Sequence, residues 1–246
     1  SLAPDSAHAQ HMFGHILPQL GRWADAAEYF LKAHRIHLRE AQVEGYATSD
    51  DWHFEHNLDL LTSTLVYLGR GAEAESLNRG QCKEGAIMSC YIESGLLMVN
   101  GKYNEALSLI KLRFNGYRNS DMITNLAILA MVGQGQLDQA RARLQQLKVA
   151  EDGDQSAGYL FARAAVELLD ASTDHEAVMD LVRHRLNRPG FDSWSKGVIH
   201  SRILARVLRE RGAPELAQRI ETMSISAYET QTCKTQACKQ NGLGKP

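Results

Sequence analysis

A short pattern that recurs along the chain constrains its fold more than any other feature of the sequence. It is a glycine followed five residues later by an alanine. The pairs are Gly21/Ala26, Gly69/Ala74, Gly101/Ala106, Gly135/Ala140 and Gly212/Ala217, and Ser172/Ala177 fits the frame with serine in place of glycine. Each glycine lies between two segments with the 3.6-residue apolar period, as the cap of one helix and the turn into the next require. An alanine suits a position where two helices cross closely. The pattern therefore predicts an all-α chain of helix pairs.

The spacing of the alanines gives the size of the unit. Successive alanines lie 48, 32, 34, 37 and 40 residues apart, and the segment 45–51, GYATSDD, is an insertion that explains the first value. We expect about six helix pairs within a solenoid domain, 1–223, whose last helix ends at Met223. A polar tail, 224–246, is expected to follow, extended or poorly ordered.

The segment HMFGHILPQLGRWADAAEYFLKAHRI resembles the tetratricopeptide repeat, a helix–turn–helix unit of about 34 residues. The residues that carry the resemblance are Gly14, Leu17, Gly21, Trp23, Ala26, Phe30 and Ala33. Weaker copies extend it over roughly residues 6–222. The resemblance implies a right-handed α–α superhelix in which the first helix of each pair lines a concave surface where ligands bind. Because many unrelated tasks share this fold, it indicates little about function.

Composition excludes several classes of protein. Of 246 residues 44% are apolar and the formal net charge is −2, so we expect a sizeable core and no nucleic-acid partner. No apolar run approaches the roughly 20 residues of a membrane span. We find no glycine-rich phosphate loop, nucleophile elbow or Cys/His/Asn catalytic set, and therefore do not expect an enzyme. Residues 1–5 read like a link between two helical repeats, so both a mature form and a fragment of a longer chain stay open.

The histidines are concentrated near the start of the chain, where seven of the ten fall within the first 56 residues. Steps of three and four residues place His8, His11 and His15 on one face of a helix. In the tetratricopeptide register these positions face the concave surface, as do His56 and Asp59 of the second pair. A histidine pair at i, i+4 with a third ligand from a neighbouring helix suits Zn²⁺ or Cu²⁺. The five residues are therefore candidate metal ligands, and the alternative is that they bind backbone, water or a peptide.

A second resemblance concerns the two histidine segments together. HAQHMFGHI followed by WHFEHN is similar to a group of bacterial tetratricopeptide proteins with a histidine-rich first repeat, and to their eukaryotic relatives. The likeness implies that the two segments belong together, and it implies no activity.

The same register predicts the rest of a groove. Tyr91, Met98 and Asn125 would line its middle, and Arg202 and Arg206 would form part of a basic stripe near its end. Such a surface could bind an extended or helical segment of a partner. The alternative is ordinary helix packing and solvated arginines. We therefore hold two hypotheses: an interaction scaffold for a protein or peptide, alone or within a larger assembly, and a protein that binds zinc or copper.

The four cysteines form two local pairs, Cys82/Cys90 and Cys233/Cys238. Two local disulfides would favour an oxidising compartment, periplasmic or secreted, over the cytoplasm. The alternative is four reduced thiols in a cytosolic scaffold.

Overall fold

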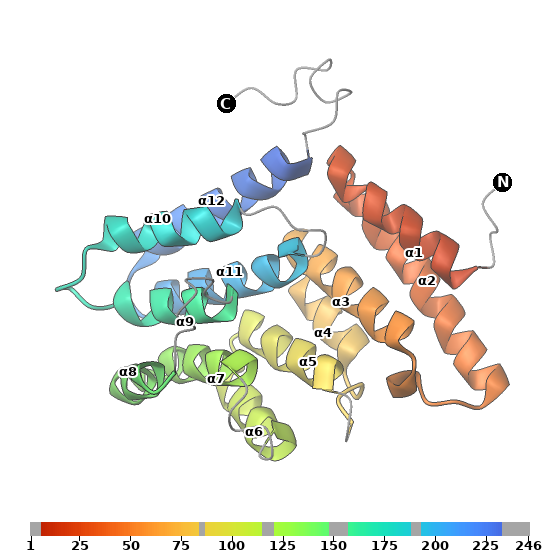
Figure 1. Ribbon diagram of the computed structural model, residues 1–246, viewed down its shortest axis with the longest axis horizontal. Helices are drawn as coiled ribbons and strands as arrows, with labels where there is room; N and C mark the ends of the chain where they lie inside the picture. The colour runs from red at the N-terminus through yellow and green to blue at the C-terminus, as the bar shows by residue number, and fades with distance from the viewer. Residues whose placement is uncertain (1–5, 84–86, 115–120, 148–156, 188–192, 233–246) are drawn as a thin grey trace. The chain divides into compact units, whose positions relative to one another are not determined.

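The protein is described by a computed structural model covering residues 6–83, 87–114, 121–147, 157–187 and 193–232 (Figure 1). The described residues form twelve α-helices and two short 3₁₀ helices, without a strand, so the chain is all-α as expected. The helices are α1 (Ala7–Ile16), α2 (Trp23–Glu44), α3 (Trp52–Tyr67), α4 (Gly71–Asn78), α5 (Ile87–Val99), α6 (Tyr103–Phe114), α7 (Asp121–Gly133), α8 (Leu137–Gln145), α9 (Ala157–Glu167), α10 (His175–Leu186), α11 (Ser193–Glu210) and α12 (Pro214–Thr232).

The glycine–alanine frame is confirmed at five of its six positions. All five glycines have a positive φ, which caps the helix before them in the left-handed conformation. All five alanines have no exposed surface, as expected of positions where two helices cross closely. The turn after α1 illustrates the chemistry: Gly21 N–H donates to the Pro18 carbonyl, and Arg22 N–H donates to the Leu17 carbonyl.

The sixth position, Ser172/Ala177, is wrong by one residue. Asp174 caps α10 by accepting hydrogen bonds from the backbone of Glu176 and Ala177, which sets the start of the helix. Ala177 is exposed there, and the next residue, Val178, is the one that is buried. Without the glycine, the register of this turn depends on the Asp174 cap, which the glycine–alanine frame does not take into account.

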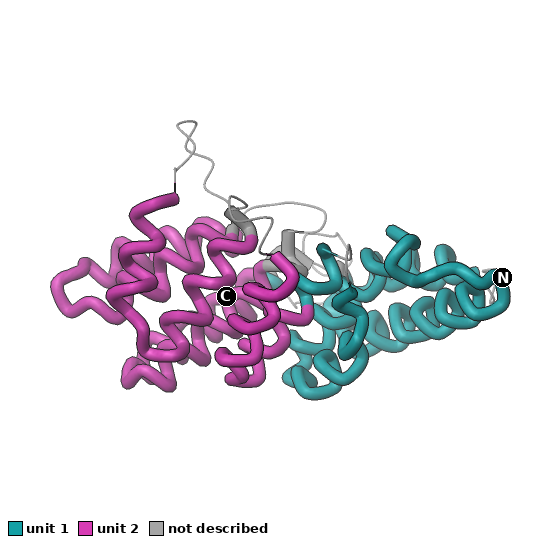
Figure 2. The backbone as a smooth tube through the Cα atoms, turned by 90° about the horizontal axis from the view of Figure 1, so that it is seen from below, with its two compact units in different colours: residues 1–92, 228–246 teal, residues 93–227 magenta. Residues whose placement is uncertain are grey.

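Two compact units divide the chain, and Figure 2 colours them separately. Residues 1–92 and 228–246 form the first unit, and residues 93–227 form the second. In the first unit α1 and α3 both pack against α2. Gly14 of α1 allows this closeness, because a Cβ atom there would stand 2.6 Å from the Phe30 ring. In the second unit α7, α9 and α11 pack on one another, with α6, α8 and α10 against them.

The last helix is longer than expected. It continues past Met223 to Thr232, so the helix does not end at Met223 as expected. The apolar period carries on through Ile220, Ser224 and Tyr228, which are all buried, and the Tyr228 ring meets Tyr67 at 6.2 Å between centroids. A helix stays favourable as long as its inner face is covered.

One of the two cysteine pairs lies in the described chain. Cys82 and Cys90 form a disulfide that closes the connection between α4 and α5, with their Cα atoms 4.3 Å apart. Cys233 and Cys238 lie outside the described residues. Among the described helices, none has both the length and the apolar character to span a bilayer.

Candidate metal centre

Three histidines from two helices converge in the first unit. His11 and His15 lie one turn apart on α1, and His56 lies in the first turns of α3. One ring nitrogen of each can be chosen so that all three nitrogens lie within 4.8 Å of one another. His11 and His15 are each only 6% exposed, and His56 is half-buried. We call these three residues the histidine cluster.

The cluster has the dimensions of a three-imidazole metal site. The Nε2 atoms of His11 and His15 are 2.9 Å apart, and zinc ligands at tetrahedral angles stand about 3.3 Å apart. The ring centroids are separated by 4.6 Å for His11–His15, 5.0 Å for His11–His56 and 5.6 Å for His15–His56. Three imidazoles that share a tetrahedral ion have centroids about 5 Å apart. A small shift of the His56 ring towards His11 and His15 would therefore let all three rings bind one ion.

Asn57, the residue after His56, orients the His11 ring. Its amide nitrogen donates to the Phe30 carbonyl at 3.0 Å, so its amide oxygen faces His11 Nδ1, also at 3.0 Å. Because an amide oxygen can only accept, His11 must carry its proton on Nδ1. Its Nε2 lone pair is then directed at His15 Nε2. This is the arrangement found behind metal-binding histidines, where an outer hydrogen bond fixes the tautomer.

Burial keeps His11 and His15 neutral. Desolvation is the main cause that lowers the pKa of His11 to about 4; the neighbouring histidines also lower it, and the Asn57 hydrogen bond opposes the shift. Desolvation and the charges of His11 and His56 likewise lower the pKa of His15 to about 4. His11 and His15 are therefore neutral at neutral pH, as metal binding requires.

Aromatic rings enclose the cluster on two sides. The Phe30 ring of α2 contacts His11 and His15 at centroid distances of 5.7 Å and 5.9 Å. Trp52 stacks on His56 at 4.9 Å, although the indole is 66% exposed. The buried Phe30 ring thus packs against His11 and His15, and the exposed Trp52 ring packs against His56.

Two of the five predicted ligands lie outside the cluster. His8 is exposed and stacks beside His11 at 6.5 Å between centroids, and its ring meets His53 edge-on at 5.9 Å. Asp59 is buried on α3, and its charge adds to the burial that raises the pKa of Tyr91. Sequence reasoning missed Asn57 and Trp52, whose only signal was their position next to the WHFEHN histidines.

The predicted groove residues are placed otherwise than the concave register implied. Tyr91, Met98 and Asn125 are buried within the helical packing and offer almost no surface to a partner. Arg202 pairs with Glu221 at 3.7 Å. Arg206 pairs with Glu210 at 2.8 Å and donates to the Val99 carbonyl.

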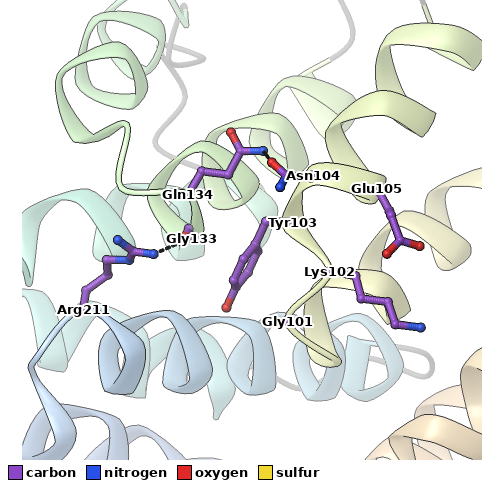
Figure 3. A pocket seen from close by; sticks show the side chains of 8 residues that line it. All are labelled: Gly101, Lys102, Tyr103, Asn104, Glu105, Gly133, Gln134 and Arg211. Atoms are coloured by element: carbon purple, nitrogen blue, oxygen red, sulfur yellow. Dashed lines mark hydrogen bonds between the residues drawn. The ribbon is translucent and has the colours of Figure 1, made fainter.

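A pocket of about 430 Å³ lies in the second unit, where α6 begins and α7 ends (Figure 3). Its cationic side chains are Lys102 and Arg211, which lie on opposite sides of Tyr103 in this view. Arg211 donates to the Gly133 carbonyl, and the Tyr103 hydroxyl donates to Glu210 at 2.8 Å. Arg211 and Tyr103 thus hydrogen-bond to other helices. The two cationic side chains of the pocket do not converge on one point.

We compared the chain with known proteins at three levels. Neither a family model, nor a curated protein, nor a solved structure matches it.

Proposed function

We propose that this protein binds one divalent transition-metal ion through His11, His15 and His56. The observation that carries the proposal is the convergence of three ring nitrogens within 4.8 Å, two of them almost fully buried. Without an ion, His11 and His15 share a hydrogen bond between their Nε2 atoms. A metal ion would replace that contact and bind one nitrogen of each of the three rings.

The donor set indicates which ions are suitable. Imidazole nitrogen suits zinc, copper, nickel and iron, whereas calcium and magnesium require oxygen ligands. The centroid spacing fits a tetrahedral ion, which favours Zn²⁺. Cu²⁺ prefers square-planar surroundings and is the second candidate, because it binds imidazole more strongly than zinc.

The scaffold hypothesis remains a weaker proposal. Its support is the resemblance to the tetratricopeptide repeat and the confirmed glycine–alanine frame. Tyr91, Met98 and Asn125, which were expected to line the middle of the groove, are buried and offer little surface to a partner. We therefore place the metal ahead of a peptide as the ligand, with the helix pairs, which we still expect to follow a right-handed superhelix, as the support for its site.

The test is the metal content of the purified protein after it is exposed to zinc and copper in turn and dialysed. We expect one equivalent of zinc by mass spectrometry, and its loss in His56→Ala and His15→Gln. His56 is half-buried, so its replacement by alanine leaves the core largely intact. His184→Ala, which removes an exposed histidine of α10, is the matched control and should retain the metal.

Trp52 supplies an independent measurement. Because its ring stacks on His56, a Cu²⁺ ion bound there should quench its fluorescence stoichiometrically, and Trp52→Phe should abolish that part of the signal. A protein that folds normally and takes up neither ion above the level of His56→Ala contradicts the proposal.

A further inference from the structure

We propose that the metal keeps a fourth coordination position for an exchangeable ligand, either water or a small anionic oxygen or nitrogen donor. The inference rests on the proposed metal site and deepens it, since it assigns a class of ligand to that site. A metal site with such a position can bind an exchangeable ligand, whereas a structural site has all its positions filled by protein ligands.

The number of protein ligands is the first argument. Structural zinc sites use four protein ligands, whereas sites that keep a working position use three. The histidine cluster contains three members, and within the described chain no fourth histidine, cysteine or carboxylate completes the 4.8 Å group. A tetrahedral ion held there has one position left.

The geometry of the neighbouring histidines is the second argument. His8 is the remaining histidine of α1, but its ring lies within 23° of parallel to His11 at 6.5 Å between centroids. A stacked ring runs alongside its neighbour, whereas the three cluster rings meet at larger angles and shorter spacings. His53 contacts His8 and lies near Asp51, with Nδ1 3.7 Å from a carboxylate oxygen.

Charge is the third argument. The three ligands are neutral, so an ion held by them alone keeps its full double charge next to two side chains that are 6% exposed. Carrying charge out of water is unfavourable, and an anionic donor halves the net charge of the centre. Hydroxide qualifies, because a bound divalent ion makes water far more acidic than it is in bulk. The same position then polarises any carbonyl or oxyanion that displaces the water.

The experiment uses Co²⁺ as a coloured substitute for zinc, which has no visible spectrum of its own. The full-length protein is loaded with Co²⁺, its stoichiometry is measured by mass spectrometry, and sodium azide is titrated while the visible bands are recorded. His8→Ala, His53→Ala and Asp59→Asn are loaded and titrated in parallel. We expect one equivalent of cobalt and a saturable shift of the bands in the wild type and in all three variants.

Two other outcomes are separable. One equivalent of cobalt with no azide response in the wild type, and a response that appears in one variant only, identifies that side chain as the fourth ligand. It overturns the open position while the metal site stands. No cobalt, zinc or copper uptake overturns the metal site itself, and the fourth position with it.

Discussion

Asn57 shows how one residue joins the packing of the first unit to the proposed chemistry. Its amide spans from the Phe30 carbonyl of α2 to the His11 ring of α1, while it belongs to α3 itself. It therefore fixes three helices relative to the histidine that anchors the cluster. Asn57 is a positioning residue, since it contacts a ligand rather than the ion.

Replacing Asn57 by alanine should weaken zinc binding by a factor of about 10–100, the usual cost of losing an outer-sphere hydrogen bond. Asn78→Ala is the matched control, because Asn78 is equally buried and donates to the Ser89 carbonyl instead. We expect both variants to lose stability, and only Asn57→Ala to lose affinity in a chelator competition. Equal affinities in the two variants would show that Asn57 is merely structural.

Buried histidines also make stability depend on pH. Burial is the main cause that lowers the pKa of His34 from 6.5 to about 4. Between those values the unfolded chain binds a proton that the folded chain does not, so stability is present above pH 6.5 and falls as the pH drops towards 4. His34 alone should cost about 2 kcal/mol between pH 7 and pH 5.

Urea unfolding at pH 7 and pH 5 measures this loss. His34→Leu keeps an apolar contact with the Phe54 ring and removes the titrating group. Between pH 7 and pH 5, the free energy of unfolding of His34→Leu should fall about 2 kcal/mol less than that of the wild type. An unchanged pH dependence in His34→Leu would contradict the assignment.

Arginines of α11 and of the turn after it bind the C-terminal ends of two neighbouring helices. Arg206 donates to the Val99 carbonyl at the end of α5, and Arg211, just beyond α11, donates to the Gly133 carbonyl at the end of α7. The terminal carbonyls of a helix have no partner within it, so the guanidinium groups satisfy them and counter the negative end of the dipole.

Two glycines allow this arrangement to be tested. Gly101 and Gly212 both have φ near +80°, at +79° and +88°, but a Cβ on Gly101 would stand 2.7 Å from the Arg206 guanidinium. Gly212 has nothing within 4 Å. Each change to alanine should cost about 1–2 kcal/mol for the left-handed backbone. We expect Gly101→Ala to cost more, because Arg206 must also leave the Val99 carbonyl.

Thermal unfolding of both variants is the measurement, repeated in an Arg206→Ala background. The excess cost of Gly101→Ala should vanish there, since the two sites are coupled through contact. If Gly101→Ala remains more destabilising than Gly212→Ala in the Arg206→Ala background, the additional cost does not come from Arg206.

The turns between helices could be predicted where a capping glycine and a buried alanine mark them. The prediction failed where the glycine is missing. Glycine caps and buried alanines are local signals, and they located the turns at Gly21 and Gly101 correctly. At Ser172 the capping glycine is missing, and the register slipped by one residue. Helix periodicity placed His11 and His15 together on one face. Asn57 could not be found, because its role depends on the contact of three helices that no local pattern encodes.

At the scale of the whole molecule, the histidine cluster lies entirely within the first of the two compact units. A ligand that binds only the folded state stabilises the cooperative unit that holds its site, by about 2.7 kcal/mol at one hundred times its dissociation constant. We therefore expect zinc to slow amide hydrogen exchange in α1 and α3. The exchange of α7 and α9 in the second unit should stay unchanged.

Hydrogen-exchange mass spectrometry with and without zinc resolves the two units peptide by peptide. His56→Ala serves as the control and should show no zinc-dependent protection anywhere. Protection spread evenly over both units would contradict a site confined to the first.

The location of the ligands along the chain has a topological consequence. His15 and His56 stand 41 positions apart, and the whole of α2 lies between them. An ion that joins them closes this stretch into a ring, as a covalent cross-link would. In the loop-entropy account a ring of that size would remove about 4 kcal/mol of freedom from an unfolded chain that kept the ion. While the ion stays bound, a cut in the connection at 45–51 would leave the two fragments fastened together.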